Sequence, residues 1–171
     1  MINCGVFKAI FIFLFIPSVI FAQASPCATE EHRQFDFWVG EWEVKNPDDQ
    51  IVGNSIIQLI LNDCVILENW KSVTPGYTGK SFNYYNRSSK KWNQKWIDSN
   101  GAPIEFEGVF NKENQALYYT ATTTNRAGDE VMNKLTFFHL SNDHVRQLWQ
   151  QSTDNGNNWI TVFDGHYRRK K

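Results

Sequence analysis

The sequence predicts an all-β fold, an antiparallel up-and-down barrel of about ten strands with a short N-terminal helix plugging one end. Short runs rich in aromatic and β-branched residues recur at regular spacing, and clusters of turn-forming residues separate them. These clusters begin at Asn46, Asn62, Thr74, Asn86, Asp98, Asn111, Asn125, Ser141 and Asp154. Such spacing is typical of an antiparallel sandwich or barrel. Because a closed barrel can surround a pocket, its inward-facing side chains are where a function is to be sought.

The first 24 residues have the pattern of an export signal. Lys8 gives a weakly positive start, an apolar stretch follows, and small residues around Ala24 suit a signal peptidase. The apolar stretch is shorter than the roughly 18–20 residues of a membrane span, which argues against the alternative of a membrane anchor. We therefore expect cleavage near Ala24 (or at Ala22), a secreted or periplasmic protein, and one domain over residues 25–171.

Charge and cysteine content restrict the partners and the compartment. Without Lys8 the mature chain has 16 basic and 18 acidic residues, a net charge of −2. This near-neutral balance gives no reason to expect nucleic acid binding or stable membrane insertion, and the basic end at 168–171 is expected to be a solvated tail. The mature chain keeps Cys27 and Cys64, which predict a disulfide in an exported protein. Two independent buried thiols are the alternative.

A short helix is predicted just before the first strand, between Thr29 and Trp38. Acidic residues lie near its start, aromatic residues give it an apolar face, and Gly40 ends it. A helix in this position suits a plug over one end of a barrel.

Alternation along each run predicts which side chains face the interior. Lys91, Asn93 and Lys95 should face water, so the residues between them face inward. The same reasoning gives the following inward set: Ile66, Glu68, Trp70, Phe82, Tyr84, Trp92, Gln94, Trp96, Ile104, Phe106, Phe110, Gln147, Trp149 and Gln151. The last strand stays ambiguous, because apolar residues alternate on both of its faces.

Polar residues in this inward set are the functional signal. An inward Glu68 is costly unless it is paired, hydrated or protonated, and Gln94 and Gln147 accompany it. A solid apolar core does not tolerate such a set easily, whereas a cavity holding water or ligand does. A filled barrel with these aromatics as core is the alternative.

The stretch from Phe35 to Val44 carries a resemblance to known proteins. Its Gly40-x-Trp42 after a short helix resembles the opening motif of calycin-type barrels, which include lipocalins, fatty-acid-binding proteins and nitrobindin-like haem proteins. The chain also resembles an uncharacterised family of exported bacterial proteins with an FDFWxGxW opening, through segments 64–70, 92–98, 146–149, 152–156 and 163–167. The resemblance implies a β-barrel and leaves the biochemistry open. In lipocalins a late arginine packs over this tryptophan, a role that Arg146 or Arg168 would have toward Trp42.

The first functional hypothesis is a non-catalytic binding barrel for a small hydrophobic or amphipathic molecule, with a saccharide as a variant. Aromatic rings would supply contact area and polar groups would fix orientation. The predicted ligand-binding residues are Glu68, Trp70, Tyr84, Gln94, Trp96, Gln147 and Trp149. No cofactor is expected, and the protein should be a monomer or a homodimer.

Two alternatives use the same barrel. A desolvated Glu68 would have a raised pKa and act as a general acid or base, with Asp98, Asp164 and His166 as further titratable groups. No nucleophile elbow, phosphate loop or metal signature accompanies it, so catalysis is the less favoured hypothesis. Haem binding would need an inward histidine, and the candidates are His139, His144 and His166.

Overall fold

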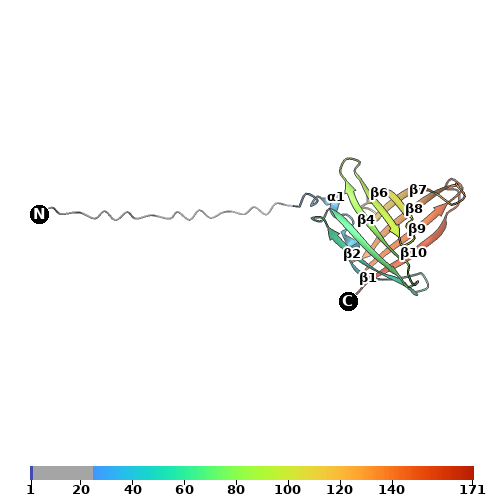
Figure 1. Cartoon of the computed structure of the whole chain (residues 1–171), viewed down its shortest axis with the longest axis horizontal. Helices are drawn as coiled ribbons and strands as arrows, with labels where there is room; N and C mark the ends of the chain where they lie inside the picture. Colours follow the sequence, from blue (N-terminus) through green and yellow to red (C-terminus); the bar gives the residue numbers. More distant parts are fainter. Residues whose placement is uncertain (2–24) are drawn as a thin grey trace.

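Ten antiparallel strands close into one barrel, as predicted, in a computed structural model that describes Met1 and residues 25–171 (Figure 1). The predicted signal peptide therefore lies, apart from Met1, outside the described residues. Each strand pairs with its neighbours in sequence, and the first strand pairs with the last. The strands are β1 (Gly40–Lys45), β2 (Ile51–Ile60), β3 (Val65–Ser72), β4 (Thr78–Asn86), β5 (Lys91–Asp98), β6 (Pro103–Asn111), β7 (Ala116–Thr124), β8 (Glu130–Ser141), β9 (His144–Ser152) and β10 (Ile160–Arg169).

Asparagine and aspartate side chains build the turns between these strands. The Asn46 side-chain oxygen accepts hydrogen bonds from the backbone amides of Asp48 (3.1 Å) and Gln50 (2.9 Å). The Asn125 oxygen does the same for Ala127 and Asp129, both at 2.9 Å. Such bonds replace water at the exposed amides of a turn, which explains why the turn clusters marked the strand ends correctly.

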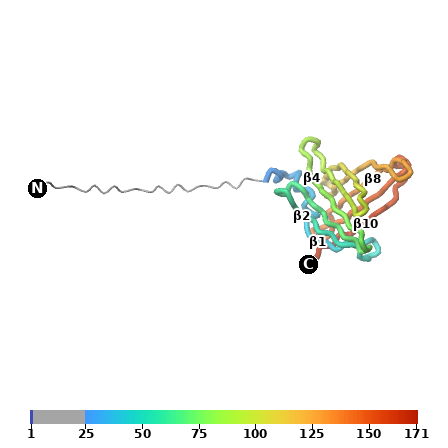
Figure 2. Tube along the Cα trace, viewed as in Figure 1, coloured from blue at the N-terminus to red at the C-terminus, as the bar shows by residue number. Residues whose placement is uncertain are grey.

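The predicted helical segment forms two short pieces, α1 (Glu30–Arg33) and the 3₁₀ turn η1 (Asp36–Trp38). Phe35 and Trp38 are fully buried and stack on each other with ring centroids 5.0 Å apart. Phe35 also meets Phe137 of β8 at 4.9 Å and Trp92 of β5 at 5.7 Å. Figure 2 follows the trace from this segment, in blue, into the barrel. No helix in residues 25–171 is long and apolar enough to cross a membrane.

The seam between β1 and β10 is fixed around Trp42. Its indole nitrogen donates to the Trp38 carbonyl oxygen (2.8 Å), and the Arg169 guanidinium lies 4.3 Å from the ring centroid. Arg169 also donates to the Val39 carbonyl oxygen (3.1 Å). Gly40 leaves room for this, since a Cβ there would lie 2.1 Å from the Arg169 Nη1 atom. The backbone pairing of β1 with β10 closes the ring of strands, and the cation–π contact lies at this closure beside the N-terminal segment.

The prediction that Arg146 or Arg168 packs over Trp42 is therefore wrong. Side chains alternate along β10, so Arg169 shares the inner face with Tyr167 while Arg168 points outward. Arg146 lies on the outer side of β9 and forms a two-pronged ion pair with Asp164 of β10, with N–O distances of 2.8 and 2.7 Å.

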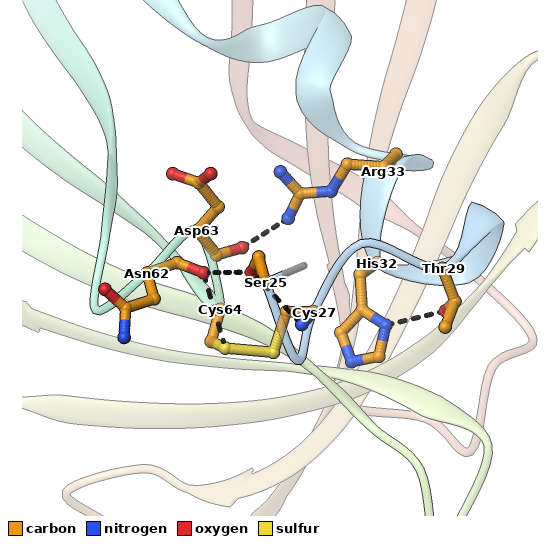
Figure 3. The surroundings of a disulfide bond; sticks show 8 residues. All are labelled: Ser25, Cys27, Thr29, His32, Arg33, Asn62, Asp63 and Cys64. Atoms are coloured by element: carbon orange, nitrogen blue, oxygen red, sulfur yellow. Dashed lines mark hydrogen bonds between the residues drawn. A yellow bond between two sulfur atoms is a disulfide. The ribbon is translucent and has the colours of Figure 1, made fainter. Parts of the chain in front are cut away.

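Cys27 and Cys64 form a disulfide, which confirms the predicted pairing (Figure 3). The bond joins the segment before α1 to the residue before β3. Two hydrogen bonds strengthen the junction: Ser25 Oγ donates to the Asn62 carbonyl oxygen (2.6 Å), and the Arg33 guanidinium donates to the Asp63 carbonyl oxygen. The N-terminal segment is thereby held on the β2–β3 turn.

Removing the disulfide should destabilise the fold. The bond spans a sequence separation of 37 residues, and closing such a loop in the unfolded chain corresponds to about 3–4 kcal/mol. We expect the double variant Cys27→Ala/Cys64→Ala to lose this amount of unfolding free energy in urea denaturation. Reductant should lower the wild-type midpoint similarly and leave that of the double variant unchanged. Equal stability of the oxidised wild type and the variant would contradict the prediction.

Candidate functional site

A cavity of about 350 Å³ occupies the end of the barrel where β2 begins, β3 ends and β4 begins. This is the end opposite Phe35 and Trp38, because Gly40 of β1 pairs with Ile57, late in β2. The cavity is lined by Val52, Glu68, Trp70, Ser72, Thr74, Tyr77, Gln94, Trp96, Phe106, Leu135, Gln147, Trp149, Val162, Phe163 and Tyr167. The structure thus brings together six of the seven predicted ligand-binding residues.

Glu68 is the buried acid of this cavity, with 3% of its surface exposed. Its carboxyl group accepts hydrogen bonds from Ser55 Oγ of β2 (3.1 Å) and Ser81 Oγ of β4 (2.9 Å), and the Tyr167 hydroxyl of β10 lies at 3.4 Å. Burial raises the pKa of Glu68 to about 7, although these three hydroxyl groups oppose the rise. Burial and the nearby Glu68 also raise the pKa of Tyr167 well above its ordinary value.

Tyr167 connects Glu68 to Gln147. Its hydroxyl lies 2.6 Å from the Gln147 side-chain oxygen, against 3.4 Å from Glu68. A tyrosine carries a single O–H donor, so the shorter contact takes the proton, and the longer contact to Glu68 is left without it. This geometry leaves the carboxylate with less stabilisation than three hydroxyl neighbours suggest, in agreement with its raised pKa.

A second branch of hydrogen bonds extends from Ser81 to Gln94. Asn83 donates to Ser81 Oγ (2.9 Å) and to the Ile66 carbonyl oxygen (3.2 Å), and it accepts a bond from the Gln94 amide nitrogen (2.8 Å). Asn83 and Ser81 are fully buried. The branch fixes the Gln94 amide so that its oxygen, which has no partner among the described residues, is left for the cavity.

Two glycines set the positions of two tryptophans in the wall. A Cβ on Gly53 would lie 2.4 Å from the Trp70 ring, and one on Gly79 would lie 2.2 Å from the Trp96 ring. Each ring therefore extends over a glycine of the preceding strand, β2 for Trp70 and β4 for Trp96. A glycine inside a strand is a known sign of such a close approach. Gly53 and Gly79, which lie inside β2 and β4, are thus the sequence signal for the close approach of a tryptophan ring.

The prediction that Phe82 and Tyr84 face inward is wrong. Tyr84 is 41% exposed on the outer face, and the inner face of β4 carries Ser81 and Asn83 instead. Ser81 lies opposite Glu68 on β3 and opposite Trp96 on β5, so bulky neighbours leave space there for small polar side chains only. Besides these two, Ser55, Phe163 and Tyr167 were missed as site residues.

The three histidines considered for haem lie away from this cavity. His144 and His166 face each other across the outer side of β9 and β10, with 3.0 Å between Nε2 of the first and Nδ1 of the second. Burial, and then positively charged Arg168, lower the pKa of His144 to about 4. His139 stacks on Phe37 at the opposite end of the barrel, with ring centroids 4.8 Å apart. None of the described histidines lines the cavity.

The raised pKa of Glu68 predicts a distinctive pH dependence of stability. Between its ordinary pKa of 4.5 and the folded value of about 7, the unfolded chain loses this proton while the folded protein keeps it. The unfolding free energy should therefore fall by about 3 kcal/mol as pH rises through this window, and level off above it. Because other groups titrate too, the measurement is the difference between wild type and Glu68→Gln in urea denaturation from pH 4 to pH 8.5. A pH-independent difference would contradict the raised pKa.

Comparison with known proteins adds no assignment to this geometry. No family model matches the chain, and no curated protein matches it. The resemblance to calycin-type barrels and to the exported FDFWxGxW family therefore stays an expectation from the sequence.

Proposed function

We propose that this protein is a non-catalytic binding barrel for a small hydrophobic or amphipathic molecule. The observation that carries the proposal is the cavity of about 350 Å³ at one barrel end, walled by aromatic side chains with a few polar groups at its base. Ligand sites in proteins have this composition and fall in this range of size, roughly 300–1,000 Å³. Trp70, Trp96 and Trp149 would provide most of the apolar contact area.

Unused hydrogen-bonding groups support a ligand rather than a filled interior. The Gln94 amide nitrogen donates to the Asn83 side-chain oxygen, and the Gln147 side-chain oxygen accepts from the Tyr167 hydroxyl. Within residues 25–171 no partner satisfies the Gln94 oxygen or the Gln147 amide nitrogen, and both residues line the cavity. One acceptor and one donor group are thus left to orient a polar part of the ligand.

Two features support a secreted or periplasmic location. The disulfide between Cys27 and Cys64 supports an oxidising environment. The export-signal pattern of residues 1–24 supports the same conclusion. We infer a secreted or periplasmic protein that acts as a monomer or a homodimer. The packing of Arg169 over Trp42, next to Gly40, supports the inferred relation to calycin-type barrels.

General acid–base catalysis is the second candidate, favoured by one observation: a carboxyl group, Glu68, lies buried in the cavity lining, and this burial raises its pKa to about 7. A carboxyl group titrating near neutral pH can both accept and donate a proton at physiological pH. Ser55 and Ser81 each donate to one of its oxygens, however, so a substrate or a ligand at Glu68 would share these oxygens with them.

Native mass spectrometry of protein purified from its own host distinguishes these candidates. A molecule that travels with the protein and is recovered unchanged after release supports binding. A recovered molecule that is converted on incubation with the wild type, but not with Glu68→Gln, would instead assign catalysis. Protein that carries nothing and takes up no apolar probe would contradict both.

The glycine positions predict how the cavity can be blocked. A Cβ at Gly53 or Gly79 would push Trp70 or Trp96 into the cavity, so a neutral fluorescent probe such as N-phenyl-1-naphthylamine should bind at least about tenfold more weakly to Gly53→Ala and to Gly79→Ala. The matched control is Thr120→Ala, an exposed residue on β7 that should leave the affinity unchanged. Unchanged probe fluorescence in both glycine variants would place the probe outside the cavity.

A further inference from the structure

The cavity lining contains one carboxyl group, that of Glu68, and no basic side chain among the described residues. Its lining consists of apolar, aromatic and neutral polar residues together with Glu68, and no lysine, arginine or histidine of the described chain lines it. The basic residue that reaches the inner face, Arg169, lies at the other end and is engaged by Trp42 and Val39. An anionic ligand would therefore meet a carboxyl group with no compensating positive charge.

Aromatic side chains surround the space next to Glu68. Trp70, Trp96, Trp149, Phe163 and Tyr167 all line the cavity, and Trp70 meets Phe163 edge to face with ring centroids 5.8 Å apart. The face of an aromatic ring is negative, so it attracts a cation, most strongly where water is excluded. The walls and the acid thus favour the same sign of charge.

A second acid lies next to one of the lining residues. Tyr77, in the β3–β4 connection, lines the cavity, and its hydroxyl interacts with the carboxylate of Asp98 at the end of β5. Burial, and then this carboxylate, raise the pKa of Tyr77, which keeps the phenol neutral. Asp98 thus adds a second acid next to a residue that lines the cavity.

We propose that the ligand is an organic cation, an ammonium group on an apolar and preferably aromatic body, with its charge against Glu68 and its body between the tryptophans. The inference rests on the proposed binding function and names its ligand class. It excludes fatty-acid-like carboxylates, which would place a second negative charge in a cavity without a base. The free oxygen of Gln94 suits the same ligand, because an ammonium N–H can donate to it.

Binding of a cation should also release a proton. The groups that face Glu68 are Ser55 from β2, Ser81 from β4 and Tyr167 from β10, all neutral near pH 7. A positive charge placed next to the carboxyl group favours its ionised form and lowers its pKa from about 7. Affinity for the cation should therefore be higher at pH 8, where the carboxylate is already ionised, than at pH 5.5.

A matched trio of probes tests the charge preference. 1-Naphthylmethylammonium, 1-naphthylmethanol and 1-naphthoate share an aromatic body and differ in charge. Isothermal titration at pH 8 should give the ammonium an affinity at least about tenfold above that of the alcohol, with the carboxylate weakest. In Glu68→Gln the ammonium should lose most of its advantage over the alcohol and keep only the part that the aromatic rings supply, while the alcohol keeps its wild-type affinity. A trimethylammonium derivative separates the contribution of the N–H donor from that of the charge.

Proton release in the wild type gives a readout that does not depend on the variant. Titrations at pH 7 in two buffers of different ionisation enthalpy should detect release with the ammonium probe and none with the alcohol. Equal affinities of the three probes, or no proton release, would overturn the cation proposal and leave the binding function standing. Failure of all three probes, together with failure of N-phenyl-1-naphthylamine, would overturn the binding function itself.

Discussion

Pairing between β1 and β10 is the constraint on which the rest of the structure depends. Once the first and last strands join, alternation sends every second side chain of ten strands into one enclosed space. Trp42 stands at this joint, held by the Trp38 carbonyl oxygen and covered by the Arg169 guanidinium. The joint also ties the N-terminal segment to the barrel, because Arg169 reaches the Val39 carbonyl oxygen. Closure therefore creates an interior and attaches the N-terminal segment beside it.

The two ends of this interior are built differently, and Glu68 lies at the boundary between them. Toward η1, Phe35 and Trp38 pack among the inward aromatics as a solid core. Toward the far end, Gly53 and Gly79 let tryptophans lie along the wall, and a cavity is left. Burial next to this core removes water from the carboxyl group of Glu68. The Ser55 and Ser81 hydroxyls donate hydrogen bonds to it, and the Tyr167 hydroxyl lies nearby. Its raised pKa is therefore a consequence of position in the barrel rather than of a charged neighbour.

Alternation predicted the faces of β5 correctly, because charged residues marked its outer face. Lys91 and Lys95 did so for β5, and both pair with glutamates of β6 on the outer surface. On β4 the large side chain of Tyr84 suggests an inward face, although exposed Lys80 two residues before Phe82 marks that face as outer. The partners of Glu68 could not be predicted in this way. Ser55, Ser81 and Tyr167 lie on other strands, and only the register of the closed barrel brings them to one carboxyl group.

A carboxyl group at position 68 is hard to explain by stability alone. Above neutral pH its ionisation opposes folding by about 3 kcal/mol, and a well-packed apolar residue would avoid that loss. Proteins accept such local destabilisation at sites where a ligand or a reaction uses the group. A cationic ligand would remove the destabilisation by supplying the charge that the cavity lining lacks. The same contact would then explain the acid, the absence of a base among the described lining residues, and the aromatic walls.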